Sequence, residues 1–359
     1  MRRARTSLPV LVGLAALSLA IPAAADRVVS EIPVPGAPAT LDSGAGALAV
    51  LPNGNLAYAW IQNERVRVAW RRSGHWSSRT LGRARGYWPD ISIVLDGARG
   101  PVVAWVDGRG VWAQTEAEVS PRLLASRRNG VVAAIRTNRG RLLVMSVAGG
   151  EKRADLALFV RQGSSWREIE RVRDVFIQRD GTVDIDLAPW GRRGYAMLFN
   201  DQRSRLVVET HASIGSRGVR HRLPLKLGEG FIEPLGGGSL GVLYGGRSLP
   251  GRERNLEFAT LRRHWLRSRV LIDNLQCDVG AIGIGRVGKQ IRLAYGYGCD
   301  VGWRLNTLGG KVAYDPFRAP NHTYMSYPNG FSSAGGQIAF AHRNVENNRL
   351  SIRVIGSER

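Results

Sequence analysis

Cysteine, histidine and long apolar runs are scarce in this chain, and each shortage argues against a class of protein. Only two cysteines and six histidines occur among 359 residues, and no histidine stands four positions from another. That pattern predicts neither a metal site nor a cofactor. Beyond residue 25, no run is long and apolar enough to span a bilayer, and no long stretch shows the 3.6-residue period of an amphipathic helix. We therefore expect an almost entirely β-stranded protein without a membrane span.

Residues 1–25 have the features of an export signal. Arg2, Arg3 and Arg5 precede an apolar segment over 8–21, and an Ala-Ala-Ala sequence ending at Ala25 offers a cleavage site of the A-x-A type. The apolar segment is too short for an ordinary membrane helix, although an N-terminal anchor is the alternative. We expect cleavage after Ala25, a secreted or periplasmic protein, and a single domain over residues 26–359.

Acidic residues are also scarce relative to basic ones. The chain has 51 Lys and Arg against 29 Asp and Glu, which gives a formal net charge of +22. Nearly all the basic residues are arginine, spread along the chain, and a compositional bias or selection for an acidic partner would each produce this. Such a charge attracts polyanions at long range. Because the sequence contains no recognised nucleic-acid-binding module, we expect acidic glycans and no specific nucleic acid.

Glycine is abundant, and most glycines fall in turns between short predicted strands. Residues 45–81 predict four strands, with a turn at Asn53 and Gly54 between the first two. One such antiparallel meander cannot cover both of its faces, so it needs copies beside it. Similar patterns recur at spacings of roughly 40 to 50 residues, which is the range of propeller blades. The first strands of the seven copies are predicted over 48–51, 91–95, 131–136, 183–187, 231–235, 281–284 and 331–334.

The first and last copies complement each other. The seventh copy offers three strands, whereas the first copy is preceded by a spare apolar strand over 27–33. If that strand supplies the fourth strand of the last blade, the ring closes and two sheet edges are covered. The predicted fold is therefore all-β: a seven-bladed β-propeller of four-stranded antiparallel blades, closed by an N-terminal strand in the last blade.

The repeats resemble those of sialidase-like (BNR-type) propellers. The shared order is an inner strand, a glycine turn, an apolar segment with Ala-Trp and an acid, an outer strand and Gly-x-Trp, as in Ala104, Trp105 and Asp107 and again in Gly74 and Trp76. The resemblance covers the whole mature chain and implies the propeller fold. The S-x-D-x-G-x-T-W box of that family is absent from every copy, so its catalytic residues cannot be transferred by motif.

In a propeller, the loops between blades and the loops joining second and third strands lie on one face. The opposite face, made of tight glycine-rich turns, is expected to contribute little. Aromatic, guanidinium and carboxylate groups on one rim suit a sugar or an acidic ligand, and simple solvation of charged loops is the alternative. The predicted ligand-binding residues are Trp88, Asp107, Arg109, Asp201, Arg203, Tyr297, Asp300 and Arg343.

Three functional hypotheses remain open. The first is a monomeric binding module with a carbohydrate or another acidic ligand over the central channel. The second is a sialidase-like glycoside hydrolase, which needs two carboxyl groups about 5 to 10 Å apart; the candidates Asp90, Asp184 and Asp278 begin predicted inner strands. The third is a structural module of a cell-envelope assembly.

The two cysteines are predicted to form a disulfide. Cys277 lies in the loop entering the sixth copy, and Cys299 lies in the loop between the second and third strands of that copy. Those loops are expected on the same face, and disulfides persist in exported proteins. A pair of separate buried thiols is the alternative.

Overall fold

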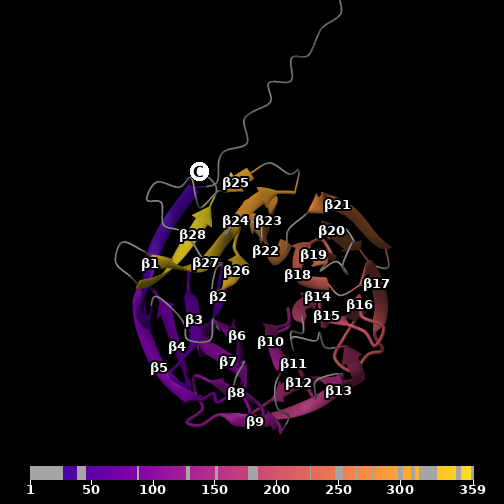
Figure 1. The fold of residues 1–359 in the computed structure, drawn as a ribbon. Coiled ribbons are helices and arrows are strands. Elements are labelled where there is room, and N and C mark those ends of the chain that lie inside the picture. The colour runs from indigo at the N-terminus through magenta and orange to yellow at the C-terminus, as the bar shows by residue number, and fades with distance from the viewer. Residues whose placement is uncertain are drawn as a thin grey trace, which may run out of the picture.

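The strands of this protein form seven four-stranded antiparallel sheets arranged in a ring (Figure 1). We describe a computed structural model over residues 27–38, 46–86, 89–126, 130–149, 153–176, 185–226, 228–246, 254–262, 265–275, 279–297, 302–308, 312–314, 330–344 and 349–356. Within these residues the one helical segment is a short 3-10 turn, η1 (Gly97–Arg99). The described residues therefore contain no helix that is long and apolar enough to cross a membrane. The predicted seven-bladed β-propeller is confirmed.

Each of the first four blades is a meander that runs outwards from the axis of the ring. Blade 1 contains β2 (Gly46–Val50), β3 (Leu56–Gln62), β4 (Arg65–Arg72) and β5 (His75–Arg83). Blade 2 contains β6 (Asp90–Leu95), β7 (Pro101–Val106), β8 (Val111–Thr115) and β9 (Arg122–Ala125). Blade 3 contains β10 (Gly130–Arg136), β11 (Leu142–Gly149), β12 (Arg153–Gln162) and β13 (Ser165–Phe176). Blade 4 contains β14 (Asp186–Trp190), β15 (Gly194–Asn200), β16 (Arg205–His211) and β17 (Val219–Lys226).

The last three blades complete the ring. Blade 5 contains β18 (Gly228–Gly236), β19 (Ser239–Gly246), β20 (Arg254–Arg262) and β21 (Trp265–Leu275). Blade 6 contains β22 (Val279–Val287), β23 (Gln290–Tyr297), β24 (Gly302–Thr307) and β25 (Val312–Tyr314). Blade 7 contains β26 (Phe331–Ala334), β27 (Gln337–Asn344), β28 (Arg349–Gly356) and, as its outermost strand, β1 (Arg27–Pro38). The innermost strands of neighbouring blades pack against one another all the way round, including β2 against β26.

The N-terminal strand closes the ring as predicted. In Figure 1 the indigo β1 lies beside the yellow β28. The two strands pair antiparallel, with Ile32 opposite Ile352, and the paired strand extends to Pro38, beyond the predicted 27–33. Every blade therefore has four strands.

The ends of several innermost strands differ from their predictions by up to three residues, and blade 4 is the example that concerns a candidate residue. The innermost strand of blade 4 begins at Asp186, three residues later than the predicted start at 183. Residues 183–187 alternate apolar and polar side chains, so the two-residue period fits either start and does not fix the end of the strand.

The core is divided among the boundaries between blades. Seven apolar clusters are formed by the described residues, and each joins two neighbouring blades. In blade 1, Ala57 and Ala59 of β3 face blade 2, whereas Tyr58 and Trp60 face blade 7. Second strands such as β3, β7 and β15 are buried on both faces, and this accounts for their continuous apolar sequences. A single blade therefore depends on both neighbours for its stability.

Candidate functional site

The loops predicted to share a face do so in blade 2. The loop entering the blade lies against the loop between β7 and β8, where the Gly108 N–H donates to the carbonyl of Arg85. The Arg85 N–H donates to Asp107 Oδ2 at 3.4 Å. Gly86 permits this approach, because its φ of 140° is rare for other residues and a Cβ there would lie 3.0 Å from Gly108 N. We call this side of the ring the loop face.

Asp107 organises the loop between β7 and β8. Its carboxylate accepts hydrogen bonds from the N–H groups of Arg109 (2.8 Å) and Gly110 (3.0 Å) and from Nε1 of Trp112 (3.1 Å). The residue is 2% exposed, so its oxygens are occupied by the protein. The half-exposed Arg109 side chain lies over the Trp112 ring, 5.4 Å from its centre, and leaves guanidinium surface open to solvent.

Asp201 plays the same part in blade 4. Its carboxylate accepts from the N–H groups of Arg203 (2.9 Å) and Arg205 (3.0 Å), and its backbone closes the turn with Arg205 and Ser204. Asp201 is less buried than Asp107, and Arg203 is exposed. Two of the predicted ligand-binding acids therefore hold turns. Arg203 is exposed beside Asp201, whereas the half-exposed Arg109 side chain pairs with Asp107 Oδ2 at 3.4 Å.

The remaining predicted residues are described only in part. Tyr297 is the last residue of β23 and Arg343 is the second-last residue of β27, and the strand positions alone are described for both. Several predictions concern residues outside the described part of the chain: Trp88, Asp184, Asp278, Asp300 and the pair Cys277 and Cys299.

Asp90, a candidate catalytic residue, lies on the innermost strand β6 and links two blades. Asp90 Oδ2 accepts a hydrogen bond from the Val132 N–H in β10 at 2.8 Å. In blade 4, Asp186 occupies the equivalent place: its Oδ2 accepts from the Ile232 N–H in β18 at 2.8 Å. Burial raises the pKa of Asp90 to about 6 and that of Asp186 to about 7, despite these hydrogen bonds.

Glu233 lies next to this second link and was not predicted from the sequence. Burial and, to a smaller extent, the nearby charge of Asp186 raise the pKa of Glu233 to about 8. The two carboxyl groups come from neighbouring blades, on β14 and β18. Its partner Asp186 could have been found from the sequence, because Asp184, which was predicted, and Asp186 lie two positions apart and both fit the strand period. The choice of Asp184 as the candidate catalytic residue depended on where β14 was predicted to begin.

A hollow of about 440 Å³ lies at the boundary of blades 3 and 4, on the face opposite the loop face. Arg139 and Arg141 come from the turn between β10 and β11, and Arg193 comes from the turn between β14 and β15. The two turns are tied together by Asn138, whose Nδ2 donates to the Gly191 carbonyl at 2.7 Å. We call this hollow the arginine groove; its other lining residues are Val160, Gln162, Ser213 and Ile214.

The arginine groove corrects the expectation that this face contributes little. The turns of blades 3 and 4 are glycine-containing, as expected, but each also carries two arginines, in the sequences NRGR (138–141) and GRRG (191–194). No carboxylate of the described residues forms an ion pair with Arg139, Arg141 or Arg193. Their guanidinium groups are exposed, so the groove is positively charged and open to solvent.

Glu170, Glu209 and His211 form a buried polar cluster at the same boundary. Their potential ligand atoms lie within 4.8 Å of one another, which makes them candidates to hold a metal ion. Burial raises the pKa of Glu170, whereas the close approach of His211 and the hydrogen bond from Arg220 outweigh burial and lower the pKa of Glu209. Burial opposes a charge on His211, but the adjacent carboxylates of Glu209 and Glu170 keep its pKa above the ordinary value. Sequence reasoning missed this cluster because its members come from two blades.

Comparison with known proteins confirms the fold and does not identify a family. No family model and no curated protein matches the sequence, so the sialidase-like assignment is not confirmed. The structure is similar to the polysaccharide lyase Uly1, with 8% identity, 92% of this chain and 99% of that chain covered, and a TM-score of 0.54. It is also similar to a mutant of AofleA from Arthrobotrys oligospora, with 11% identity, 75% and 85% covered, and a TM-score of 0.50. A fucose-specific lectin from Aleuria aurantia matches with 10% identity, 87% and 95% covered, and a TM-score of 0.46.

Proposed function

We propose that the protein is an exported β-propeller that binds an acidic polysaccharide in the arginine groove. The observation that carries the proposal is the convergence of Arg139, Arg141 and Arg193 on one hollow without a described carboxylate to neutralise them. Guanidinium groups bind carboxylate and sulfate groups through paired hydrogen bonds of fixed geometry. A groove of this size accommodates one or two sugar units.

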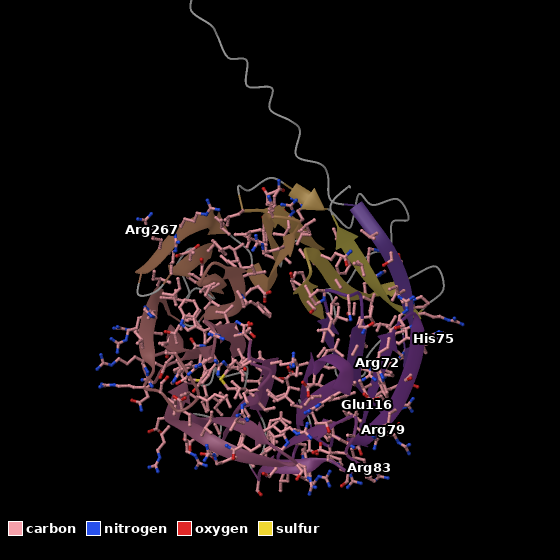
Figure 2. All side chains as sticks on the ribbon, turned by 180° about the vertical axis from the view of Figure 1, so that it is seen from behind. Arg72, His75, Arg79, Arg83, Glu116 and Arg267 are labelled. Atoms are coloured by element: carbon pink, nitrogen blue, oxygen red, sulfur yellow. The ribbon has the colours of Figure 1, made fainter. Side chains whose placement is uncertain are left out.

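Two further features support this ligand class. The net charge of +22 attracts a polyanion from a distance and raises the rate of encounter. Figure 2 shows part of this charge on the outer edge of the ring, where Arg83 and Arg267 project from β5 and β21. The fold is shared with a protein described as a polysaccharide lyase, which agrees with a polysaccharide ligand. On the opposite, loop face, Arg203 is a further exposed cationic side chain.

Binding to immobilised acidic and neutral polysaccharides tests the proposal. We expect binding to heparin or polygalacturonate and none to a neutral glucan, with an affinity that falls as salt screens the charges. The triple variant Arg139→Ala, Arg141→Ala and Arg193→Ala should bind about tenfold more weakly or worse. The matched control removes the same charge from exposed outer-strand positions: Arg83→Ala, Arg173→Ala and Arg267→Ala. An equal loss of affinity in both triples would show that only the total charge matters.

A glycoside hydrolase is the second candidate, and the pair Asp186 and Glu233 favours it. Carboxyl groups with pKa values raised to about 7 and 8 remain protonated near neutral pH, as a general acid requires. Among the candidate catalytic residues Asp90, Asp184 and Asp278, Asp90 lies on the same ring of innermost strands. A panel of chromogenic glycosides tests this function, with Glu233→Gln as the inactive variant. Activity unchanged by Glu233→Gln would remove this pair from the mechanism.

A further inference from the structure

The cluster at the boundary of blades 3 and 4 has the spacing of ligands around one metal ion. Glu170 lies on β13, and Glu209 and His211 lie on β16. His211 Nε2 is 3.3 Å from Glu209 Oε1 and 3.5 Å from Glu170 Oε2. Ligand atoms placed about 2.1 Å from a tetrahedral zinc ion are about 3.4 Å from one another. His211 Nε2 therefore lies at ligand spacing from each carboxylate oxygen, and all three potential ligand atoms lie within 4.8 Å of one another.

The orientation of His211 indicates that a cation belongs at this point. Its Nδ1 lies 2.8 Å from the Ser216 carbonyl, and because a carbonyl only accepts, Nδ1 carries a proton. In the neutral ring, Nε2 then points a lone pair at two carboxylates. The side chain is 3% exposed, and Nε2 has no well-aligned hydrogen-bond partner. Buried polar groups are normally satisfied, so either a proton or a metal ion lies between Nε2 and the carboxylates.

The surrounding residues hold the three candidate ligands as metal ligands are usually held. Besides the Ser216 carbonyl on His211, the Tyr195 hydroxyl donates to Glu170 Oε2 at 2.8 Å, and Arg220 Nε donates to Glu209 Oε2 at 2.5 Å. The Tyr195 ring also stacks on the His211 ring, with centres 4.5 Å apart and planes inclined by 10°. Such outer hydrogen bonds fix the imidazole tautomer and orient the carboxylates.

Gly218 preserves the space that Glu209 occupies. A Cβ at this position would lie 2.1 Å from Glu209 Oε1, the oxygen that faces His211. Any other residue would therefore push the candidate ligand away from its present place.

A second buried histidine provides an internal contrast. His342 Nε2 lies 3.3 Å from Glu31 Oε1, which reproduces the spacing between His211 and Glu209. An arginine occupies the same place in both clusters: Arg353 lies 2.6 Å from Glu31 Oε2, and Arg220 lies 2.5 Å from Glu209 Oε2. In the cluster between blades 3 and 4, a second carboxylate, that of Glu170, also faces the imidazole, and two carboxylates with one imidazole suit a divalent ion.

We propose that Glu170 Oε2, Glu209 Oε1 and His211 Nε2 bind one Zn²⁺ ion between blades 3 and 4. Two blades contribute ligands, so the ion links the outermost strand of blade 3 to the third strand of blade 4. Three protein ligands leave a fourth tetrahedral position for water. This inference is independent of the arginine groove, since none of the groove arginines contributes a ligand.

Metal content and direct titration test the proposal on the intact chain. We expect about one zinc per chain in protein purified with zinc and then gel-filtered, and a rise in Tm when ZnCl₂ is added to chelator-treated protein. Co²⁺ should give the visible absorption of a tetrahedral site. Glu209→Gln should abolish stoichiometric binding, and Tyr195→Phe should weaken it by about 10-fold to 100-fold. Glu168→Gln removes a nearby carboxylate that pairs with Arg171 and is the matched control.

Titration of the wild-type protein with ZnCl₂ and Co²⁺ tests the proposal even if a variant fails to fold. No zinc in the purified protein together with no binding of ZnCl₂ or Co²⁺ would overturn the proposal and leave a protonated His211 in the cluster. Equal zinc binding by wild type and a folded Glu209→Gln would also overturn it. Loss of binding in Glu168→Gln as well would show that the ion sits elsewhere on β13.

Discussion

Glu31 and Arg353 form an ion pair with 2.6 Å between Oε2 and Nη2, although β1 and β28 are the first and last strands of the described chain. Arg353 Nε donates to the same oxygen at 3.1 Å, and His342 Nε2 lies 3.3 Å from the other oxygen. Arg353 and His342 are buried in blade 7. The strand that closes the ring is thus held by charge as well as by its backbone hydrogen bonds.

Removing the Glu31 carboxylate should weaken this closure. We expect Glu31→Gln to lower the free energy of unfolding by about 2–3 kcal/mol, because charge-assisted hydrogen bonds to buried partners are lost. Chemical denaturation measures the change. Glu168→Gln breaks an exposed ion pair with Arg171 and should have a much smaller effect, because solvent screens that pair. Equal effects of the two substitutions would contradict a special role for Glu31.

The same carboxylate should make the protein sensitive to acid. The hydrogen bond from His342 and the ion pair with Arg353 outweigh burial and lower the pKa of Glu31 from 4.5 to about 2. A lowered pKa in the folded chain means that the stabilising contribution is complete above about pH 4.5 and is lost as the pH falls to about 2. The difference in Tm between wild type and Glu31→Gln should therefore shrink over that range. A constant difference from pH 6 to pH 2 would argue against it.

Glu233 should produce the opposite dependence on pH. Burial, with the charge of Asp186, raises its pKa from 4.5 to about 8, so the folded chain favours the protonated form. Stability should fall as the pH rises from about 4.5 to about 8, because the unfolded chain ionises Glu233 more readily. Glu233→Gln should remove part of this fall and match wild type at pH 4.5. A thermal-melting series in pH steps measures it; parallel curves for wild type and Glu233→Gln would contradict the prediction.

Asp107 should matter more for stability than its loop position suggests. Replacing it with alanine leaves the N–H groups of Arg109 and Gly110 and the Trp112 indole without their acceptor. We expect a loss of about 2–3 kcal/mol in urea denaturation. Asp201→Ala should cost less, because water reaches the more exposed turn of blade 4, and Arg109→Ala should cost least. Wild-type stability in Asp107→Ala would show that the turn forms without its carboxylate.

The disulfide between Cys277 and Cys299 stays a prediction, and both residues lie outside the described part of the chain. The prediction rests on a chain with two cysteines in total and on the expected export, since disulfides persist in exported proteins. Mass spectrometry of the unreduced protein should find one intramolecular bond. Two free thiols would contradict it. Reduction should lower the free energy of unfolding by about 3 kcal/mol in the loop-entropy model.

The fold could be predicted because its determinants are local and repeated. Turn glycines, two-residue alternation and repeat spacing define each blade, and the spare strand that contains Glu31 defines the closure. The end of a strand is predicted less securely, as Asp184 and Asp186 show, because the two-residue alternation of the sequence fits a strand that starts near either residue. The arginine groove and the cluster of Glu170, Glu209 and His211 depend on which turns and strands of two blades meet. Nothing in the local sequence encodes that meeting, although the NRGR and GRRG turns were visible.

Because β1 is the outermost strand of blade 7, the propeller ring can close only after the other strands of that blade have formed. During synthesis β1 emerges first and its partner β28 emerges last, while the blades between them can form one after another. Until residues 349–356 are available, β1 has no partner strand, and Tyr58 and Trp60 of blade 1 lack the side chains of blade 7 that cover them. A chain that stops early therefore keeps an exposed strand edge and an exposed aromatic surface, which chaperones and proteases recognise. The pairing of β1 with β28 is thus possible only in a chain that extends to the third strand of blade 7.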